Sequence, residues 1–185
     1  MKILLDFRLS LILIIAKDRI FISLSESGHL KKIQKTLELL EYSFEELSSE
    51  QKNLVENSQK AFEYSPYSNF PVGAAILLNS GEVIKGSNQE NAAYPSGLCA
   101  ERVALFNYGA NFKDQEIAAM AISIKNPINT FAFPCGSCLQ VISEYENKQS
   151  KEFEIIISHP SEDKYLISKG VSNLLPFSFK KENLI

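Results

Sequence analysis

The chain has 185 residues, and 45% of them are hydrophobic, which suffices for the core of one domain. Its formal net charge is −3, with 19 Lys and Arg against 22 Asp and Glu. This balance argues against a dedicated nucleic-acid-binding protein, because such proteins usually carry a basic face. The chain contains three cysteines, an odd number without dense spacing, which does not describe a secreted disulfide scaffold. We therefore expect a reducing compartment, with thiols available for metal binding or catalysis.

Residues 1–30 differ in composition from the rest, and we expect an extension of unknown role to a domain that comprises residues 31–185. The apolar run Leu9–Ala16 is too short to cross a bilayer as a helix. Lys2 and Arg8 precede this run, as in a secretory signal, but no small-x-small cleavage site follows it. The segment fits an added edge strand or helix, an extension outside the ordered domain, or a start codon placed too early, and these alternatives stay open.

The first clear element in chain order is a helix that begins with the capping box Ser48–Gln51. Apolar residues at helical spacing extend it to Phe62, and Pro66 ends it. The preceding segment, Lys35–Tyr42, fits either a helix or a strand. The elements expected next are strands over 72–78 and 83–87, a helix over 98–107, a strand over 117–124, a helix over 134–146, strands over 153–158 and 164–167, and a short helical turn closed by Pro176. Strands that alternate with helices predict a layered α/β domain with a mixed sheet.

The three cysteines lie in two short segments, Cys99-Ala100-Glu101 and Pro134–Cys138, and each segment opens a predicted helix. Free N–H groups and the helix dipole favour thiolates at such positions. Cys135 and Cys138 are three residues apart, so their side chains share one helical face, and Cys99 can approach from the other helix. Three thiolates make three corners of a tetrahedral zinc site and leave the fourth open for water. Composition alone would favour three small buried hydrophobes instead.

Glu101 follows Cys99 by two residues, which places a carboxylate beside the open position without making it a ligand. A lone C-x-x-C is weak evidence, because redox and structural sites share it. Together, however, C-A-E and P-C-G-S-C match the signature of zinc deaminases in its three-cysteine form. His29 and His159 have no ligand-like spacing. A structural zinc module is therefore disfavoured, since it needs four protein ligands.

Five segments in a fixed order carry a resemblance to a known family: Tyr67–Ala74, Gly86–Asn91, Tyr94–Arg102, Pro134–Cys138 and Leu174–Phe179. Over residues 47–179 the chain resembles the homotetrameric zinc-dependent cytidine deaminases. The resemblance implies a three-layer α/β/α domain with a mixed sheet of about five strands and one Zn²⁺ per subunit. It implies hydrolysis of cytidine, 2′-deoxycytidine or both to the uridine nucleosides and ammonia. It also implies a cytoplasmic homotetramer whose partner is a small pyrimidine nucleoside, with neither nucleic acid nor membrane.

The resemblance also assigns residue roles. It implies that Cys99, Cys135 and Cys138 hold zinc, and that Glu101 protonates ring nitrogen N3 and then the departing amine. The substrate-binding set that it implies consists of Asn88 and Glu90 at the ribose hydroxyls, Phe70 on the pyrimidine, the backbone of Ala100 at the base, and Phe179 near a subunit contact, in position to enter a neighbour's pocket. Four of these residues have a plainer alternative: a turn for Asn88, core packing for Phe70, packing of the C-terminus for Phe179, and a surface charge for Glu101.

One position departs from the family. Leu139 follows the last cysteine, where the family commonly has Arg. Three thiolates leave a zinc site with a net negative charge, and Arg102 remains to offset it from outside the ligand shell. The rival substrates are another aminopyrimidine or a blasticidin-like nucleoside. A polynucleotide substrate is disfavoured, because no cluster of Lys and Arg accompanies these segments.

Overall fold

The computed structural model describes residues 14–15, 19–26, 29–62 and 65–184. The chain divides into two compact units, Met1–Glu38 and Leu39–Ile185. In the first unit, strands β1 (Ile14–Ile15), β2 (Arg19–Glu26) and β3 (His29–Thr36) form an antiparallel sheet in that order. Of the apolar run Leu9–Ala16, residues 9–13 and 16 lie outside the described residues.

The second unit is built on a six-stranded sheet with the order β4-β9-β8-β7-β5-β6. Its strands are β4 (Leu40–Tyr42), β5 (Val72–Leu78), β6 (Val83–Ser87), β7 (Ile117–Ile124), β8 (Glu154–Ser158) and β9 (Tyr165–Ser168). The β7–β8 pair is parallel and the other pairs are antiparallel, which confirms the predicted mixed sheet. The sixth strand is β4, from the segment that fitted either a helix or a strand.

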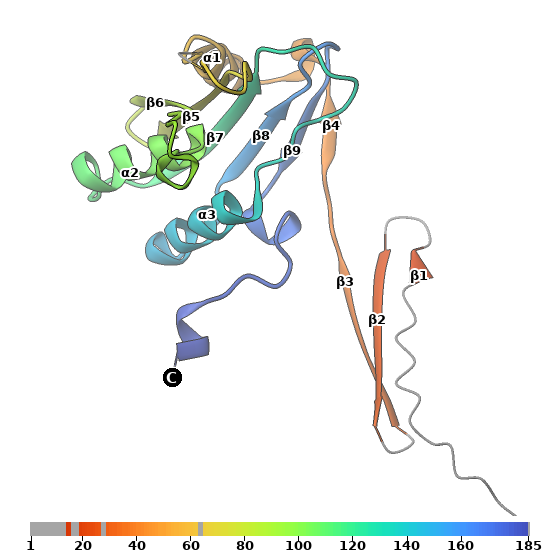
Figure 1. Ribbon diagram of the computed structural model, residues 1–185. Helices are drawn as coiled ribbons and strands as arrows, with labels where there is room; N and C mark the ends of the chain where they lie inside the picture. The colour runs from red at the N-terminus through yellow and green to blue at the C-terminus, as the bar shows by residue number, and fades with distance from the viewer. Residues whose placement is uncertain (1–13, 16–18, 27–28, 63–64, 185) are drawn as a thin grey trace, which may run out of the picture. The chain divides into compact units, whose positions relative to one another are not determined.

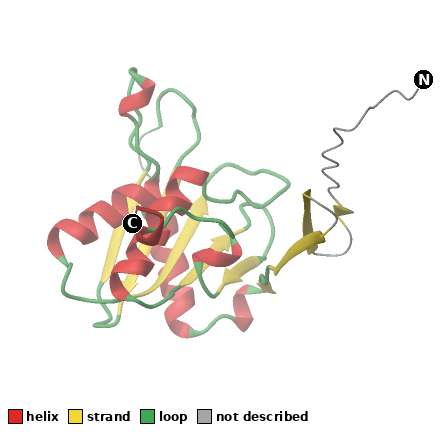
Figure 2. Ribbon diagram, turned by 90° about the horizontal axis from the view of Figure 1, so that it is seen from below, coloured by secondary structure: helices red, strands yellow, loops and turns green. Residues whose placement is uncertain are grey.

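Three α-helices cover the sheet: α1 (Ser49–Gln59) lies on one face, and α2 (Ala100–Asn111) and α3 (Gly136–Gln149) lie on the other (Figure 1). Figure 2, seen from below, shows helices in front of the strands. Alternate residues of β5 serve the two faces, as the twofold period of a strand requires. Ala75 packs in the core beneath α1, whereas Ala74 and Ile76 pack beneath α2 and α3. This arrangement confirms the three-layer α/β/α fold. Among the described residues, no helix is both long enough and apolar enough to cross a bilayer.

The predicted helices differ from the observed ones mainly at their ends. The capping box at Ser48 and Gln51 is present as predicted and starts α1. Both α2 and α3 begin two residues later than predicted, because Cys99 and Cys135 have extended backbones and act as N-caps. Helix α2 also runs four residues further than predicted, through Gly109. A Cβ at Gly109 would lie 2.4 Å from Oη of Tyr145, so this glycine lets α2 pack closely against α3.

The C-terminal segment differs from the prediction in one detail. The short helical turn expected to end at Pro176 is a 3-10 turn over Val171–Asn173, and Leu174 caps it. The remaining strand boundaries agree with the prediction to within one residue, and β5, β6 and β7 match it at both ends.

Candidate active site

Three thiols converge where α2 and α3 begin. Cys99 caps α2, Cys135 caps α3, and Cys138 lies in the first turn of α3. All three sulfur atoms lie within 4.8 Å of one another, and those of Cys135 and Cys138 are 3.5 Å apart. Neither capping thiol accepts a capping hydrogen bond from its own helix. The sulfurs therefore gather at two helix N-termini, where the dipoles favour negative charge.

Gly86 on β6 allows α2 to approach this position. A Cβ at Gly86 would lie 2.5 Å from the backbone N of Ala104 and 2.6 Å from the carbonyl O of Ala100. Any side chain here would press on the backbone of the first turns of α2. The glycine thus sets the height above the sheet at which Cys99 and Glu101 are held.

The geometry of the three sulfurs fits a tetrahedral zinc ion. Zinc–sulfur bonds of about 2.3 Å place two ligand sulfurs about 3.8 Å apart, which is compatible with the spacing found here. Among the described residues, no fourth His, Cys, Asp or Glu joins this group. Three ligands with one open position are typical of catalytic zinc rather than structural zinc.

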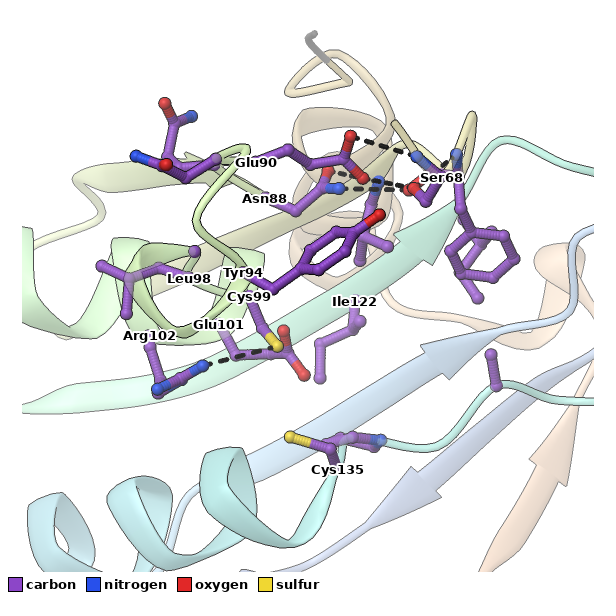
Figure 3. Close-up of a pocket in the computed structure, with 18 of the residues that line it drawn as sticks. Ser68, Asn88, Glu90, Tyr94, Leu98, Cys99, Glu101, Arg102, Ile122 and Cys135 are labelled. Carbon is purple, nitrogen blue, oxygen red and sulfur yellow. Dashed lines mark hydrogen bonds between the residues drawn. The ribbon is translucent and has the colours of Figure 1, made fainter. Parts of the chain in front are cut away.

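The pKa values of Cys99 and Cys138 are shifted in opposite directions. Hydrogen bonding with Cys138, assisted by the Arg102 guanidinium, lowers the pKa of Cys99 to about 5. Nη2 of Arg102 donates to Sγ of Cys99 at 3.7 Å (Figure 3). The same contact with Cys99, together with burial, raises the pKa of Cys138. Without metal, the hydrogen-bonded pair of Cys99 and Cys138 therefore favours one thiolate and one thiol, and a binding metal ion would displace the remaining proton.

Glu101 lies beside the thiols, in the first turn of α2, with its carboxyl group near the sulfur of Cys99 (Figure 3). Only 4% of its surface is exposed. Burial raises the pKa of this carboxyl, and the charge on Cys99 adds to the effect. A carboxyl whose pKa is raised holds and releases a proton closer to neutral pH, which suits general acid–base catalysis.

A cavity of about 550 Å³ extends from the thiols to the end of the sheet, a size that suits a small organic ligand. Seven of the predicted site residues line it: Phe70, Asn88, Glu90, Cys99, Glu101, Arg102 and Cys135. Cys138 lies behind the other two thiols and is fully buried, as is Ala100. Figure 3 shows that Glu90 and Asn88 come from one wall of the cavity, and that Cys135 comes from the opposite one.

Phe179 does not line the cavity of its own chain. Gln140, two residues after Cys138, holds both backbone groups of Phe179. Its Oε1 accepts from N of Phe179 at 3.0 Å, and its Nε2 donates to O of Phe179 at 2.7 Å. The ring of Phe179 is 56% exposed.

The sequence interpretation missed several residues that line the cavity, among them Ser68, Tyr94, Ile122, Ile124 and Phe133. A signal existed for some of them. Ser68 and Tyr94 lie inside segments that carried the family resemblance. Ile122 and Ile124 end a strand whose neighbour in the sheet, β8, runs parallel to it, and ligands commonly bind beyond such strand ends. Phe133 stands in a loop, where periodicity gives no signal.

A three-layer α/β/α domain whose helix N-termini present three thiols and a buried carboxyl defines a zinc-dependent deaminase of nucleobases or nucleosides. Residues 48–151 match the family model described as the cytidine and deoxycytidylate deaminase zinc-binding region. The chain belongs to this family, as its sequence resemblance predicted.

Curated relatives and solved structures agree with this membership. The chain is 37% identical to a cytidine deaminase of Sporosarcina psychrophila, over 71% of this chain and 92% of that one. It is 39% identical to a cytidine deaminase of Halalkalibacterium halodurans, over 65% of this chain and 86% of that one. The crystal structure of a cytidine deaminase from Burkholderia pseudomallei superposes with a TM-score of 0.59 at 37% identity, covering 69% of this chain and 97% of that one.

Proposed function

We propose that this protein hydrolyses cytidine, 2′-deoxycytidine or both to the matching uridine nucleoside and ammonia. One observation carries the proposal: the thiols of Cys99 and Cys135 and the carboxyl of Glu101 line the same cavity as Phe70, Asn88 and Glu90, and the buried thiol of Cys138 completes the cysteine cluster. Reactive groups at one part of the cavity and an aromatic ring with polar partners at another suit a base joined to a sugar. The names of the curated relatives support this substrate.

Cys99, Cys135 and Cys138 would hold one Zn²⁺ per subunit. When bound, zinc supplies a Lewis acid that makes a water molecule nucleophilic near neutral pH. Arg102 would offset part of the negative charge of the thiolates through its contact with Cys99. It is the only cationic side chain that lines the cavity in the described part of the chain.

Glu101 would move the protons. Its carboxylate accepts a proton from the attacking water and delivers it to N3 of the ring, while the water oxygen bonds to C4. It then takes the remaining proton of that hydroxyl to the exocyclic nitrogen, which leaves as ammonia as C4 regains a carbonyl. Burial suits Glu101 to this exchange, because it brings the pKa of the carboxyl closer to neutral pH.

Phe70, Asn88 and Glu90 would orient the nucleoside, with the backbone of Ala100 at the base. The carboxylate of Glu90 accepts from a sugar hydroxyl, and the amide of Asn88 can both donate and accept. Holding the sugar keeps C4 against the nucleophile, which lowers the entropic part of the barrier. Glu90→Gln should therefore weaken deamination of cytidine far more than any deamination of free cytosine. Equal losses on both would favour the rival class, deaminases of other aminopyrimidines.

The first test follows the ultraviolet absorbance of cytidine with zinc-loaded protein and its Glu101→Gln variant. We expect cytidine absorbance to be lost with wild type, and the rate to fall at least about a hundredfold in the variant, the usual contribution of general acid–base catalysis. Unchanged cytidine with wild type would refute the proposal, and a fully active variant would refute the role of Glu101.

We further propose a cytoplasmic homotetramer in which Phe179 enters a neighbouring subunit's cavity. Its exposed ring, its anchored backbone and the exposed rings of Phe106 and Phe177 support a surface that associates with other copies. Light scattering after size-exclusion chromatography tests this. We expect the mass of four chains for wild type, and a monomeric mass would contradict the assembly.

A further inference from the structure

The loop that carries Phe70 into the cavity is held by side chains rather than by regular secondary structure. It links α1 to β5, and Asn69 within it adopts a left-handed backbone with φ of 53°. From the loop that follows β7, Nδ2 of Asn126 donates to the carbonyl O of Asn69 at 2.7 Å. The shape of this loop therefore depends on a few specific polar contacts.

Both backbone groups of Phe70 bond to side chains. The N–H of Phe70 donates to Oγ of Ser68 at 3.0 Å, and its carbonyl O accepts from Nδ2 of Asn88 at 3.1 Å. Oδ1 of Asn88 accepts from the N–H of Val72 at 2.9 Å, at the start of β5. Ser68 and Asn88 thus fix the main chain at Phe70 from its two sides.

Ser68 also holds Glu90. Its hydroxyl donates to Oε1 of Glu90, and its N–H donates to Oε2 of Glu90 at 3.3 Å (Figure 3). Oε2 of Glu90 also accepts from the N–H of Tyr67 at 2.8 Å. A carboxylate has about four acceptor sites, so these three contacts leave one, on Oε1. Hydrogen bonds from Ser68 and Tyr67 also lower the pKa of Glu90, which keeps it an ionised acceptor.

We infer that Ser68 is a positioning residue for the nucleoside: one hydroxyl aligns Glu90 toward a single sugar hydroxyl and fixes the main chain that carries Phe70 beside the base. This inference rests on the proposed roles of Glu90 and Phe70. Because Ser68 acts through them and not on the reacting atoms, its loss should weaken binding and leave the chemical step intact.

The chain offers a matched control. Oγ of Ser80 accepts from the N–H of Glu82, two residues ahead, as Oγ of Ser68 accepts from Phe70. Ser80 lies in the exposed β5–β6 turn, remote from the cavity lining. Ser68→Ala and Ser80→Ala therefore remove the same kind of local hydrogen bond, and only the first removes a bond to Glu90.

The kinetic test uses the zinc-loaded, full-length protein with cytidine. We expect Ser68→Ala to raise KM about tenfold, the loss of one hydrogen bond to a charged group, with kcat within about twofold of wild type. Ser80→Ala should match wild type, and Ser68→Thr, which keeps the hydroxyl, should largely restore KM. In a Glu90→Gln background, Ser68→Ala should raise KM by less than it does in wild type, because only the part of its effect that passes through Phe70 remains. The inference would be overturned if Ser68→Ala and Glu90→Gln raised KM by fully independent factors, or if Ser68→Ala lowered kcat alone.

Amide hydrogen exchange gives a second measurement that needs no substrate. Ser68→Ala should speed exchange in peptides that cover residues 65–72, whereas Ser80→Ala should not; unchanged exchange in both would overturn the positioning role. Failure of the proposed function and failure of the role of Ser68 give different results. Wild type that leaves cytidine unchanged refutes the proposed function and the nucleoside role together. Active wild type, with Ser68→Ala indistinguishable from Ser80→Ala, refutes the role of Ser68 alone.

Discussion

Replacing Glu146 with Gln should change how the stability of the protein depends on pH. Glu146 lies on α3 and only 6% of its surface is exposed. Its Oε1 accepts from the N–H of Phe153 at 3.3 Å and from the N–H of Val171 at 3.1 Å. Burial raises the pKa of this carboxyl to about 7, although both hydrogen bonds act in the opposite direction. The folded protein therefore binds this proton more tightly than the unfolded chain does.

The sign of the effect follows from this difference. The stabilisation is fully present below the unfolded pKa of about 4.5 and is lost as pH rises through the folded pKa of about 7. The full shift corresponds to about 3 kcal/mol, and allowing for partial screening we expect on the order of 2 kcal/mol. Gln keeps the acceptor oxygen for both N–H groups but has no proton to lose. Relative to wild type, Glu146→Gln should gain about 2 kcal/mol between pH 4.5 and 8.

Thermal unfolding at fixed protein and zinc concentration measures this gain. For a chain of this length, 2 kcal/mol corresponds to a change of about 4–8 °C in Tm. Glu144→Gln, on the exposed face of the same helix, is the control and should run parallel to wild type. Subtracting the wild-type stability from that of the variant at each pH removes the contributions of titrating groups that both proteins share, including the thiols. A Glu146→Gln curve parallel to wild type across this pH range would refute the reasoning.

Two further substitutions test the metal end of the site. Gly86→Ala places a Cβ 2.5 Å from the backbone N of Ala104, so we expect a loss of about 1–3 kcal/mol and weaker zinc retention against a chelator; unchanged metal content would contradict the close approach. Leu139→Arg introduces a cation one residue after Cys138, in place of a side chain that is only 8% exposed. It should shift the pH profile of turnover, because positive charge near the thiolates changes the acidity of zinc-activated water. Indistinguishable profiles would show that Arg102 suffices.

The sequence predicted elements best where periodicity and capping agreed. The capping box at Ser48 located α1, and the apolar run over Ile117–Ile124, interrupted only by Ser123, defined β7, because this central strand is covered on both faces. The three residues of β4 were ambiguous, because a short edge strand has too few residues for its period to show. What decides that segment is its antiparallel pairing with β9, a contact distant in the chain.

The candidate site was predictable only in part, for a related reason. Cys99, Glu101, Cys135 and Cys138 have fixed spacing on two helices, so a local pattern reveals them. Ser68 has no such pattern, because its partner Glu90 lies 22 residues away and meets it only in the folded chain. Sequence alone also does not show that Phe179 lies outside the lining of its own cavity, with its backbone held by Gln140, because these contacts join segments distant in the chain.

The two parts of the cavity are built by different physical means, and this has a consequence for function. The N-terminus of α2 and its close approach to Gly86 fix the positions of Cys99 and Glu101. Because these positions depend on the backbone, few side-chain substitutions can move the reacting groups by small amounts. Side-chain hydrogen bonds, centred on Ser68 and Asn88, hold the part proposed to bind the sugar. Single substitutions there can alter nucleoside affinity in small steps without disturbing the thiols. Substrate preference should therefore change more readily than reaction chemistry, with KM varying widely among variants of the loop and kcat varying little.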